Sequence, residues 1–397
     1  MRTERQTDDK RTADGVKSEK GVFAVIKPIR EAWKGTMTPR ERFNRQMHFK
    51  SVDRCFNMEF GYWNENFSEW DLFVKNGITT NEQADIFFAF DPIEVIGGRK
   101  TVWMSPHFPE EVIEKRGDKL IIQNRDGVIA EVPKDKRSTI PHFIRSSIVT
   151  PADWDKVKRE RFDLNSPGRI LDVEGTKSAH PPERGYPLGV YCGSMIGKIR
   201  DMLTFEGICY AWADYPDMLE DMVETCCLVA ERALDQLLGE VDFDYAAGWE
   251  DICFNHGPIL PPDFFKEVIA PRYKRIGRKL KDHGIDIWYT DCDGDVSLLM
   301  PIFLDCGINC LFPFEVNSCA FPGEFLDRYE GLRIMGGVDK MQLIAGPDAI
   351  KSYLKRLAPY VERGGFIPFC DHRCPPDVSP ENYLYYLDLK EKMFGMG

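Results

Sequence analysis

The sequence lacks a long apolar run. No uncharged apolar stretch among its 397 residues approaches the ~18 residues that suggest a membrane span. The opening segment, MRTERQTDDKRTADGVKSEK, is charged throughout and has no apolar region of the kind a secretory signal needs. These absences predict a soluble cytoplasmic protein without a membrane partner, whose first residues form a polar, partly disordered extension.

The sequence also has fewer basic than acidic residues. The chain has 52 Lys and Arg residues against 64 Asp and Glu residues, a formal net charge of −12. Because phosphate binding relies on clustered Lys and Arg, nucleic acid is not an expected partner.

Several common motifs are absent. The twelve cysteines are scattered rather than arranged as short repeated pairs, and without an export signal they are expected to stay reduced. The sequence contains no Gly-rich phosphate-binding loop, dinucleotide fingerprint or nucleophile elbow. The commonest nucleotide-binding and serine-hydrolase classes are therefore excluded.

What the chain does contain is a regular alternation of short apolar runs with amphipathic runs, which is typical of βα units on a parallel sheet. The second half has five such runs, at 243–249, 285–290, 308–314, 332–336 and 366–370, with helical stretches such as 262–282 and 347–363 between them. Runs at 55–60, 86–90 and 187–192 supply three more. Together they predict an α/β fold, a (β/α)8 TIM barrel.

One segment breaks this pattern. Between residues 98 and 148 the apolar runs are short and separated by the turn sequences RGD at 116–118 and NRDG at 124–127. An antiparallel β meander inserted into the barrel is expected there. The sequence TPRE at 38–41 predicts the start of a first helix. We therefore expect a polar extension over 1–36 and one barrel domain over 37–397, with the insertion at about 98–148.

Acidic residues follow most of the apolar runs. In a parallel barrel the active site collects residues just beyond the strand ends, and those residues here are Glu59, Asp91, Glu250, Asp251, Asp291, Asp293, Glu315, Asp339 and the CDHRC segment at 370–374. Side chains alternate along a strand, so Asp291 and Asp293 should share one side, as should Cys370 and His372. Such groups could bind a metal, hold a substrate or share protons, or they could cap helices and pair with Lys or Arg.

Two kinds of residue stand out among these strand ends. His372 is one of only seven histidines and follows a strand beside two cysteines, which favours a functional role. Tyr62, Trp63, Trp249 and Trp288 also lie close to strand ends, where they could line an aromatic pocket or pack in the core.

Five blocks of the sequence carry a family resemblance over roughly residues 37–396. GSMIGKIRDMLTFEGICYAWADYPDML, WEDICFNHGPILPPDFFKEVIAPRYKRI, YTDCDGDVSLLMPIFLDCGINCLFPFEV, MGGVDKMQLIAGPDAI and FIPFCDHRCPPDVSPENYLYYLDL resemble successive blocks of the uroporphyrinogen decarboxylase superfamily, in that family's order. The resemblance implies a (β/α)8 barrel. The family includes uroporphyrinogen decarboxylases and also methyltransferases that work with corrinoid proteins, among them zinc enzymes that methylate coenzyme M and relatives proposed to demethylate methoxylated aromatics.

Departures from the family pattern favour the methyltransferase branch. The decarboxylases read Met-Arg-Gln-Ala-Gly-Arg near their first strand, whereas this chain reads MEFGYW at 58–63. Glu59 and the other acids would repel a polycarboxylate. The zinc methyltransferases bind metal through a His-x-Cys pair and a further Cys, positions that appear here as Asp291-x-Asp293 and His372. These ligands suit zinc but make it less fit to activate a thiol, so an ether or amine methyl donor is expected instead of coenzyme M.

The sequence therefore predicts an O-demethylase-like methyltransferase that moves a methyl group from a small donor, such as an aryl methyl ether, to a corrinoid protein. Asp291, Asp293 and His372 would hold a metal, with zinc as the candidate, or a proton, while Glu250 and Asp91 orient the donor. The expected substrate-binding residues are Glu59, Tyr62, Trp63, Trp249, Trp288, Glu315 and Cys370. The chain has no Asp-x-His-x-x-Gly motif, so cobalamin should arrive on the partner protein.

Two other functions compete with this one. The first is a cofactor-free decarboxylase of a smaller acid that uses Asp91 and His372. The second is a non-catalytic scaffold, which the ionisable groups at five or more strand ends disfavour. The identity of the donor and the oligomeric state are open, a homodimer being one alternative.

Overall fold

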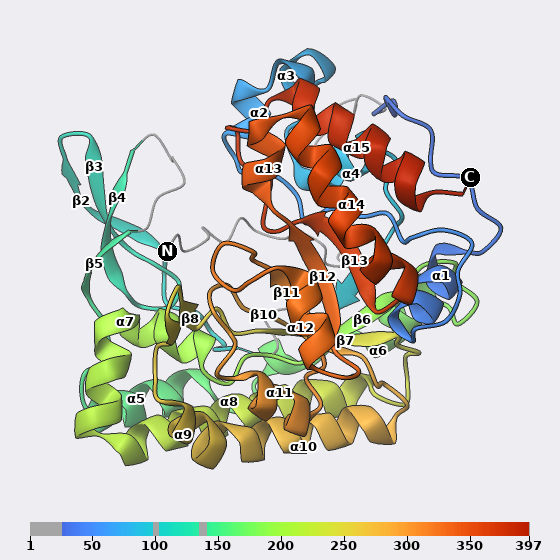
Figure 1. The fold of residues 1–397 in the computed structure, drawn as a ribbon. Helices are drawn as coiled ribbons and strands as arrows, with labels where there is room; N and C mark the ends of the chain where they lie inside the picture. Colours follow the sequence, from blue (N-terminus) through green and yellow to red (C-terminus); the bar gives the residue numbers. More distant parts are fainter. Residues whose placement is uncertain (1–25, 98–102, 135–140, 397) are drawn as a thin grey trace. The chain divides into compact units, whose positions relative to one another are not determined.

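The chain folds into two compact units. The computed structural model describes residues 26–97, 103–134 and 141–396 (Figure 1). Unit 1 comprises Val95–Pro182 and Gly189–Ile308, and unit 2 comprises 26–94, Glu183–Leu188 and 309–396 of the described residues.

Unit 1 has a parallel sheet at its centre. Its strands run in the order β1 (Glu94–Ile96), β6 (Leu188–Tyr191), β7 (Tyr245–Trp249) and β10 (Trp288–Asp291). The middle strand β7 pairs in parallel with β6, where Val190 faces Ala246, and with β10, where Trp288 faces the same alanine. Every residue of β6 and all but the last of β7 are buried. Burial on both faces explains why these strands read as unbroken apolar runs.

Helices cover this sheet. They are α5 (Pro151–Arg161), α6 (Val173–Ala179), α7 (Gly197–Asp214), α8 (Pro216–Leu237), α9 (Pro262–Phe264), α10 (Ala270–Asp282) and α11 (Met300–Cys306), with a 3-10 turn at Pro167–Arg169 and a π-helical segment at Phe265–Ile269. In α8, residues at helical spacing such as Met222, Cys226 and Val229 are buried. This helix packs against α7 and α10 (Figure 1).

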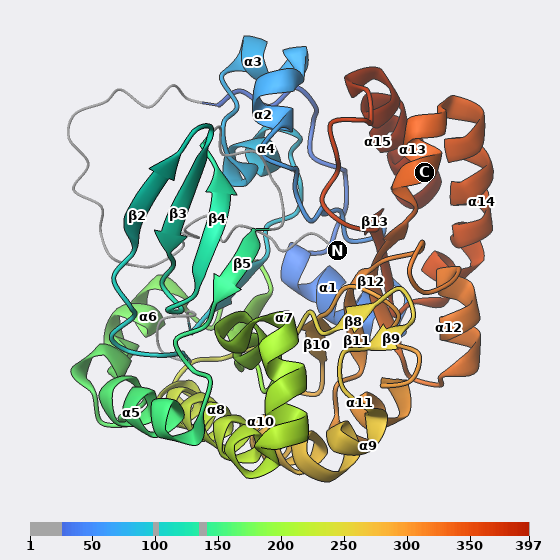
Figure 2. The ribbon, with the colours of Figure 1, turned by 90° about the vertical axis from the view of Figure 1, so that its left-hand side faces the viewer.

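The remaining strands of unit 1 are antiparallel. A four-stranded sheet runs in the order β2 (Glu111–Arg116), β3 (Lys119–Gln123), β4 (Ile129–Pro133) and β5 (His142–Arg145) (Figure 2). Arg116 faces Lys119 across a two-residue turn whose Gly117 has φ +53°, a conformation that glycine adopts without strain. A short hairpin joins β8 (Cys253–Phe254) to β9 (Gly257–Pro258). The expected antiparallel meander is confirmed.

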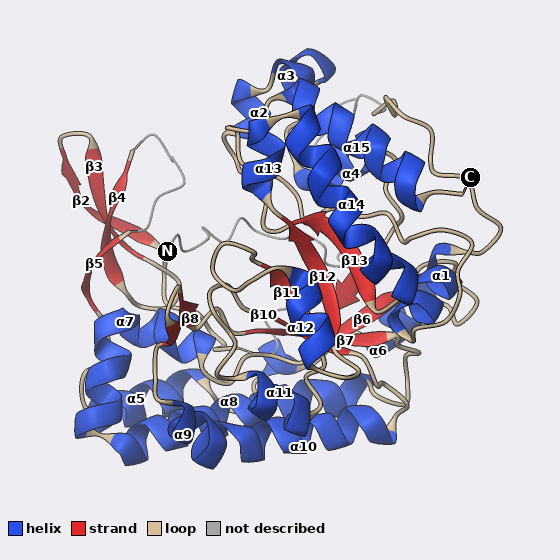
Figure 3. Cartoon of the chain, viewed as in Figure 1, coloured by secondary structure: helices blue, strands red, loops and turns tan. Residues whose placement is uncertain are grey.

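Unit 2 contains three parallel strands, β11 (Cys310–Phe314), β12 (Arg333–Val338) and β13 (Phe366–Cys370), and every residue in them is buried. Its helices are α1 (Pro39–Met47), α2 (Asn66–Glu69), α3 (Asp71–Asn76), α4 (Asn81–Phe87), α12 (Pro322–Arg328), α13 (Lys340–Ala345), α14 (Pro347–Arg363) and α15 (Pro380–Phe394). Helix α12 contacts β12, and α14 lies between β13 and α15 (Figure 3).

Most elements expected from the sequence are present. All five apolar runs of the second half contain a strand, the helix expected at 347–363 is α14, and Thr38 caps α1 by accepting the backbone N–H of Glu41. The run at 187–192 contains β6.

Two expected strands are not strands in the structure. Residues 55–60 form no ladder, and the prediction for 86–90 was wrong, because these residues include the end of helix α4. The hydroxyl of Thr80 caps that helix, and the helical spacing of Ala84 and Phe87 buries both side chains. The aromatic run was thus the buried end of a helix.

The α/β class is confirmed, with parallel strands and a separate antiparallel sheet. The large sheet has four strands in unit 1 and three in unit 2, and the described residues do not show a closed ring of eight. Parts of the expected extension and insertion, at 1–25, 98–102 and 135–140, lie outside the described residues. Over the described ranges, no helix is long and apolar enough to cross a bilayer.

Candidate functional site

In unit 1 the acid that follows β7 is fully enclosed by hydrogen-bond donors. Glu250 accepts the backbone N–H groups of 195–197 at 2.7–2.9 Å, the hydroxyl of Ser194 at 3.0 Å and that of Tyr273 at 2.7 Å. The three N–H groups stand at the start of α7, where a helix leaves donors without internal partners. Burial raises the pKa of Glu250, and the hydrogen bonds from Met195 and its neighbours lower it in part. The carboxylate thus joins the end of β7 to the beginning of α7.

Next to Glu250 lies a buried charge network on α7. Asp201 bridges the two cations of that helix, with its carboxylate 2.9 Å from Lys198 Nζ and 2.7 Å from Arg200 Nη2. Arg200 Nη1 reaches Asp251 Oδ2 at 2.9 Å. Both cations also lie over the indole ring of Trp249, with Lys198 Nζ 4.4 Å and Arg200 Cζ 5.3 Å from its centroid. The network therefore holds Trp249, the last residue of β7, and Asp251 two residues beyond it.

Backbone strain accompanies this network. Asp251 has φ +47° and Thr204 has φ +73°, both in the left-handed region. Such residues cost roughly 1–3 kcal/mol each and persist where their surroundings determine them. Here Arg200 Nη1 donates to the carbonyl oxygen of Asp251 at 2.6 Å as well as to its carboxylate. The sequence analysis included Asp251 among the strand-end acids but missed Arg200, because neither spacing nor composition distinguishes it from a surface arginine.

The Asp251 carboxyl has an altered acidity. Burial raises its pKa to about 6, Arg200 opposes that rise, and Asp293 adds to it. Between pH of about 4 and 6 the folded protein therefore holds a proton that the unfolded chain releases, so the free energy of unfolding falls as the pH rises through this window.

We predict that Asp251→Asn, which keeps an acceptor for Arg200 but cannot titrate, flattens this dependence. Urea unfolding at several pH values between 4 and 7 measures it. As a control, Asp235→Asn on the exposed face of α8 should leave the slope unchanged. An unchanged slope in Asp251→Asn would show that Asp251 keeps its ordinary acidity.

The antiparallel sheet contributes a further buried acid. Asp126 lies in the turn between β3 and β4 and accepts the indole N–H of Trp103 at 2.7 Å. Burial raises the pKa of Asp126, while the nearby charge of Lys198 lowers it and that of Asp201 raises it. The turn between β3 and β4 is thus electrostatically coupled to the network on α7.

Asp291 and Asp293 lie at the end of β10 in the same unit. Their side chains are half-buried and that of Cys292 between them is buried, an alternation that agrees with the expected side-chain parity. The carbonyl of Asp291 accepts the N–H groups of Glu250 at 2.8 Å and Asp251 at 3.2 Å. The structure therefore brings the ends of β7 and β10 together. Trp288 is buried deeper, edge-on to Tyr273 with ring centroids 5.9 Å apart.

In unit 2 the expected substrate-binding residue Glu59 forms a buried ion pair with Lys390. Its Oε1 lies 2.8 Å from Lys390 Nζ and accepts the Tyr386 hydroxyl at 2.8 Å, and its Oε2 accepts the N–H of Cys370 at 3.1 Å. The side chains of Lys390 and Glu59 are 0% and 1% exposed. Because the pair carries no net charge, Glu59 does not by itself repel a polycarboxylate, contrary to the reasoning from sequence.

Two more expected site residues of unit 2 are enclosed by protein. Asp91 forms a two-pronged pair with Arg54, at 2.6 and 2.8 Å. Tyr62 lies in an aromatic core, with its hydroxyl 2.6 Å from that of Tyr383 and its ring edge-on to Phe73. These contacts favour structural roles for Asp91 and Tyr62.

Three residues that follow β11, β12 and β13 meet in unit 2. Lys340 Nζ lies 3.2 Å from Asp371 Oδ1 and 3.6 Å from Glu315 Oε1. Burial raises the pKa of Asp371 to about 6 although Lys340 opposes this, and Glu315 raises it further. The sequence analysis missed Lys340, since a lysine at the start of a helix looks like an ordinary solvated residue.

His372 follows Asp371 directly and contacts two aromatic side chains. Its half-buried ring is edge-on to Phe60 at 5.6 Å and to Trp63 at 6.3 Å between centroids. The indole N–H of Trp63 donates to the carbonyl of Arg373 at 3.0 Å, which ties the 58–63 segment to the loop after β13. His372 and Trp63 thus belong to one cluster.

The predicted meeting of Asp291 and Asp293 with His372 joins residues of different units and stays a prediction. Across the described ranges, no group of three His, Cys, Asp or Glu side chains is arranged to hold a metal ion.

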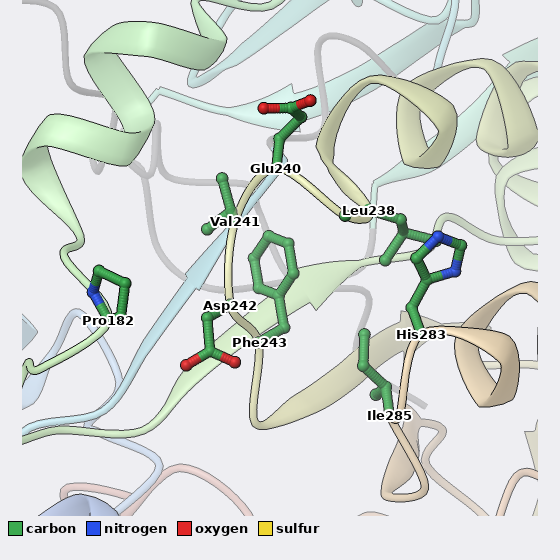
Figure 4. A pocket seen from close by; sticks show the side chains of 9 residues that line it. Pro182, Leu238, Glu240, Val241, Asp242, Phe243, His283 and Ile285 are labelled. Atoms are coloured by element: carbon green, nitrogen blue, oxygen red, sulfur yellow. The ribbon is translucent and has the colours of Figure 1, made fainter.

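A cavity of about 300 Å³ lies elsewhere in unit 1 (Figure 4). It is lined by Pro182, Leu238, Gly239, Glu240, Val241, Asp242, Phe243, His283 and Ile285. These residues include those that precede β7 and β10, so the cavity lies at the amino ends of the strands. Chemistry in parallel α/β sheets is found at the carboxyl ends, where the acids described above lie.

The fold is of the α/β class, with acidic groups gathered at the carboxyl ends of its parallel strands. The family model "Uroporphyrinogen decarboxylase (URO-D)" matches residues 129–392, that is 264 of the 397 residues. The chain belongs to the uroporphyrinogen decarboxylase family, which confirms the resemblance seen in the sequence.

Comparisons with whole proteins show a likeness in fold. No curated protein matches the sequence. Among solved structures, a methyltransferase from Methanosarcina mazei is similar with a TM-score of 0.54 and 12% sequence identity, over 90% of this chain and 99% of that one. At this identity the likeness concerns the fold.

Proposed function

We propose that this protein is a corrinoid-dependent methyltransferase, which moves a methyl group from a small donor such as an aryl methyl ether to a corrinoid protein. Family membership and the likeness in fold to a methyltransferase support this. The observation that carries this proposal is that the 58–63 segment contains no arginine or lysine. Where the resemblance places the arginines of the decarboxylases, Glu59 is sealed against Lys390 and Tyr62 is packed in an aromatic core. The segment offers no cation to a porphyrinogen carboxylate.

We also propose the closed (β/α)8 barrel over 37–397, with the insertion at about 98–148. Support comes from unit 2, where the chain after 55–60 runs beside the segment that follows β13. Tyr62 bridges in parallel to Cys374, whose N–H donates to the carbonyl of Gly61 at 2.9 Å. The 55–62 segment would be the missing strand.

The reaction defines what the chain must supply. Methyl transfer breaks the bond between the methyl carbon and the donor oxygen, which leaves with negative charge and is stabilised by a proton or a cation. The corrinoid, held by its partner protein, would supply the nucleophile. The task of this chain is to bind the donor, orient it and neutralise the departing oxygen.

We assign these tasks to the half-buried groups. His372 would protonate the departing oxygen, because it is half-exposed beside Trp63. Asp291 and Asp293 would orient the donor. Glu250 and Asp91 are saturated with protein partners, so we assign them positioning roles. Zinc at Asp291, Asp293 and His372 stays a separate proposal, tested by metal analysis of the purified protein.

The test is a methyl-transfer assay with free cob(I)alamin as acceptor and methoxyarenes, methanol or methylamines as donors. The expected result is donor-dependent methylation of the corrinoid, followed by its absorbance. Release of CO2 from an added carboxylic acid without corrinoid, together with no methyl transfer from any donor, would select the decarboxylase instead.

A further inference from the structure

Strand β2 forms one edge of the four-stranded antiparallel sheet of unit 1 (Figure 2). All six of its residues are exposed, and over the described ranges of the chain β3 is the strand that pairs with it. The outer side of an edge strand presents backbone N–H and C=O groups that the sheet itself does not use, so another strand can add to it.

Two neighbouring apolar side chains stand in the middle of this edge. Val112 and Ile113 are 51% and 50% exposed. A bulge lies at this point, because Val112 faces Ile122 of β3 while Glu114 faces the preceding Ile121, so that Ile113 faces no residue of β3. Apolar surface of this kind gains free energy when a second strand covers it.

The charges of β2 are separated by sign along the strand. Residues 110–116 read EEVIEKR, with two acids at the start and two bases at the end. When two copies of a strand pair antiparallel about a two-fold axis, the start of each lies against the end of the other. A pairing centred on Ile113 sets Glu111 opposite Lys115 of the second copy, twice by symmetry. A shift by one residue sets Glu111 opposite Arg116 and keeps the match. The strand is therefore complementary to itself.

The other edge of the sheet lacks this property. Strand β5, His142–Arg145, contains no acid and has a basic group at each end. Antiparallel pairing of two β5 strands would set His142 against Arg145, which is unfavourable when both are charged. Pairing of β2 with β5 of another copy is head-to-tail and generates rings or filaments instead of a closed pair. Pairing of β2 with β2 thus combines closure with matched charges.

From these observations we infer that the protein forms a two-fold homodimer by antiparallel pairing of its β2 strands. The pairing joins two four-stranded sheets into one continuous sheet of eight strands. Ile113 of one copy meets Ile113 of the other at the axis, and the two Glu111–Lys115 pairs flank them. The inference goes beyond the proposed function and does not depend on it, because it involves neither the methyl donor nor the corrinoid.

The test is analytical ultracentrifugation of the full-length chain over a dilution series at low salt, where the wild type should sediment as a dimer. Glu111→Lys or Lys115→Glu should weaken the dimer by roughly 30-fold, because two cross-strand pairs change from opposite to like charge. Arg116 is left unchanged, since it pairs with Glu114 of its own strand. Lys75→Glu, an exposed charge reversal on α3 of unit 2, is the control and should leave the dimer intact.

Mixing the two variants separates lost pairing from lost folding. A heterodimer of Glu111→Lys with Lys115→Glu has opposite charges at both positions, so the mixture should recover the dimer, as should the double variant. A misfolded chain would not be rescued in this way. A second pair of variants distinguishes the two edges: Ile113→Asp sets two acids against each other at the axis and should dissociate the dimer, whereas Ile144→Asp on β5, at a residue that is 47% exposed, should not.

A wild-type chain that sediments as a monomer at micromolar concentration would overturn the inference. So would a dimer that neither charge variant weakens, or one that Ile144→Asp dissociates and Ile113→Asp does not. A dimer that is lost in both charge variants and is not recovered on mixing them would likewise refute the pairing of β2 with β2.

Discussion

Replacing His372 with alanine should lower the rate of methyl transfer by about 10²–10⁴-fold, the usual range for losing a group that transfers a proton in the transition state. Stability should change little, because the ring lies half-buried in the loop after β13, beside the edges of Phe60 and Trp63, and its loss opens no large cavity in the core. Turnover and melting temperature are measured on the same preparations, so that the two effects can be separated.

His283→Ala provides the matched control for this variant. His283 lies in the loop before β10, beside the cavity at the amino end of that strand, and its Nδ1 is 2.8 Å from the carbonyl of Lys279. Removing it should change neither turnover nor melting. If His372→Ala turned over a methyl donor at nearly the wild-type rate, the histidine would be incidental and the mechanism proposed here would have to be abandoned.

Replacing Lys390 with methionine should destabilise the fold by about 3–5 kcal/mol, because it leaves the charge of Glu59 buried without its partner. The change removes two hydrogen bonds at once, since Lys390 Nζ donates to the carbonyl of Met58 at 3.0 Å as well as to Glu59. Denaturant unfolding monitored by circular dichroism gives the difference in free energy.

Two further variants make this result interpretable. Lys390→Met combined with Glu59→Gln removes both charges and should recover part of the loss. Lys75→Met breaks an exposed pair with Asp71, 72% and 81% exposed, and should have no measurable effect. A loss below about 1 kcal/mol in Lys390→Met would mean that the buried pair is not needed for stability.

The sequence predicted the elements whose signal is local. Alternating apolar runs identified all five strands of the second half, and the TPRE motif located the start of α1. The run at 86–90 misled because its apolar residues are consecutive, a pattern that a buried helix end shares with a buried strand.

The site was less predictable, because its partners are far apart in the sequence. Position after a strand identified Glu250, Asp291 and His372, but it could not reveal that Glu250 is saturated with hydrogen bonds and that His372 is half-buried. Glu59 is separated from Lys390 by 331 residues. No local pattern reports such a pair, so its neutrality and the loss of the expected repulsion became visible only in the structure.

The enclosure of Glu250 has a consequence for which ligands the protein can accept. The start of a helix commonly receives the phosphate or carboxylate of a ligand, because its free N–H groups and dipole attract anions. In α7 the chain fills that place with its own carboxylate, which also uses the nearby hydroxyls of Ser194 and Tyr273. The N–H groups that would bind a phosphate or carboxylate of a ligand are already bonded to Glu250. The N–H groups at the start of α7 are therefore excluded as a binding site for an anionic ligand.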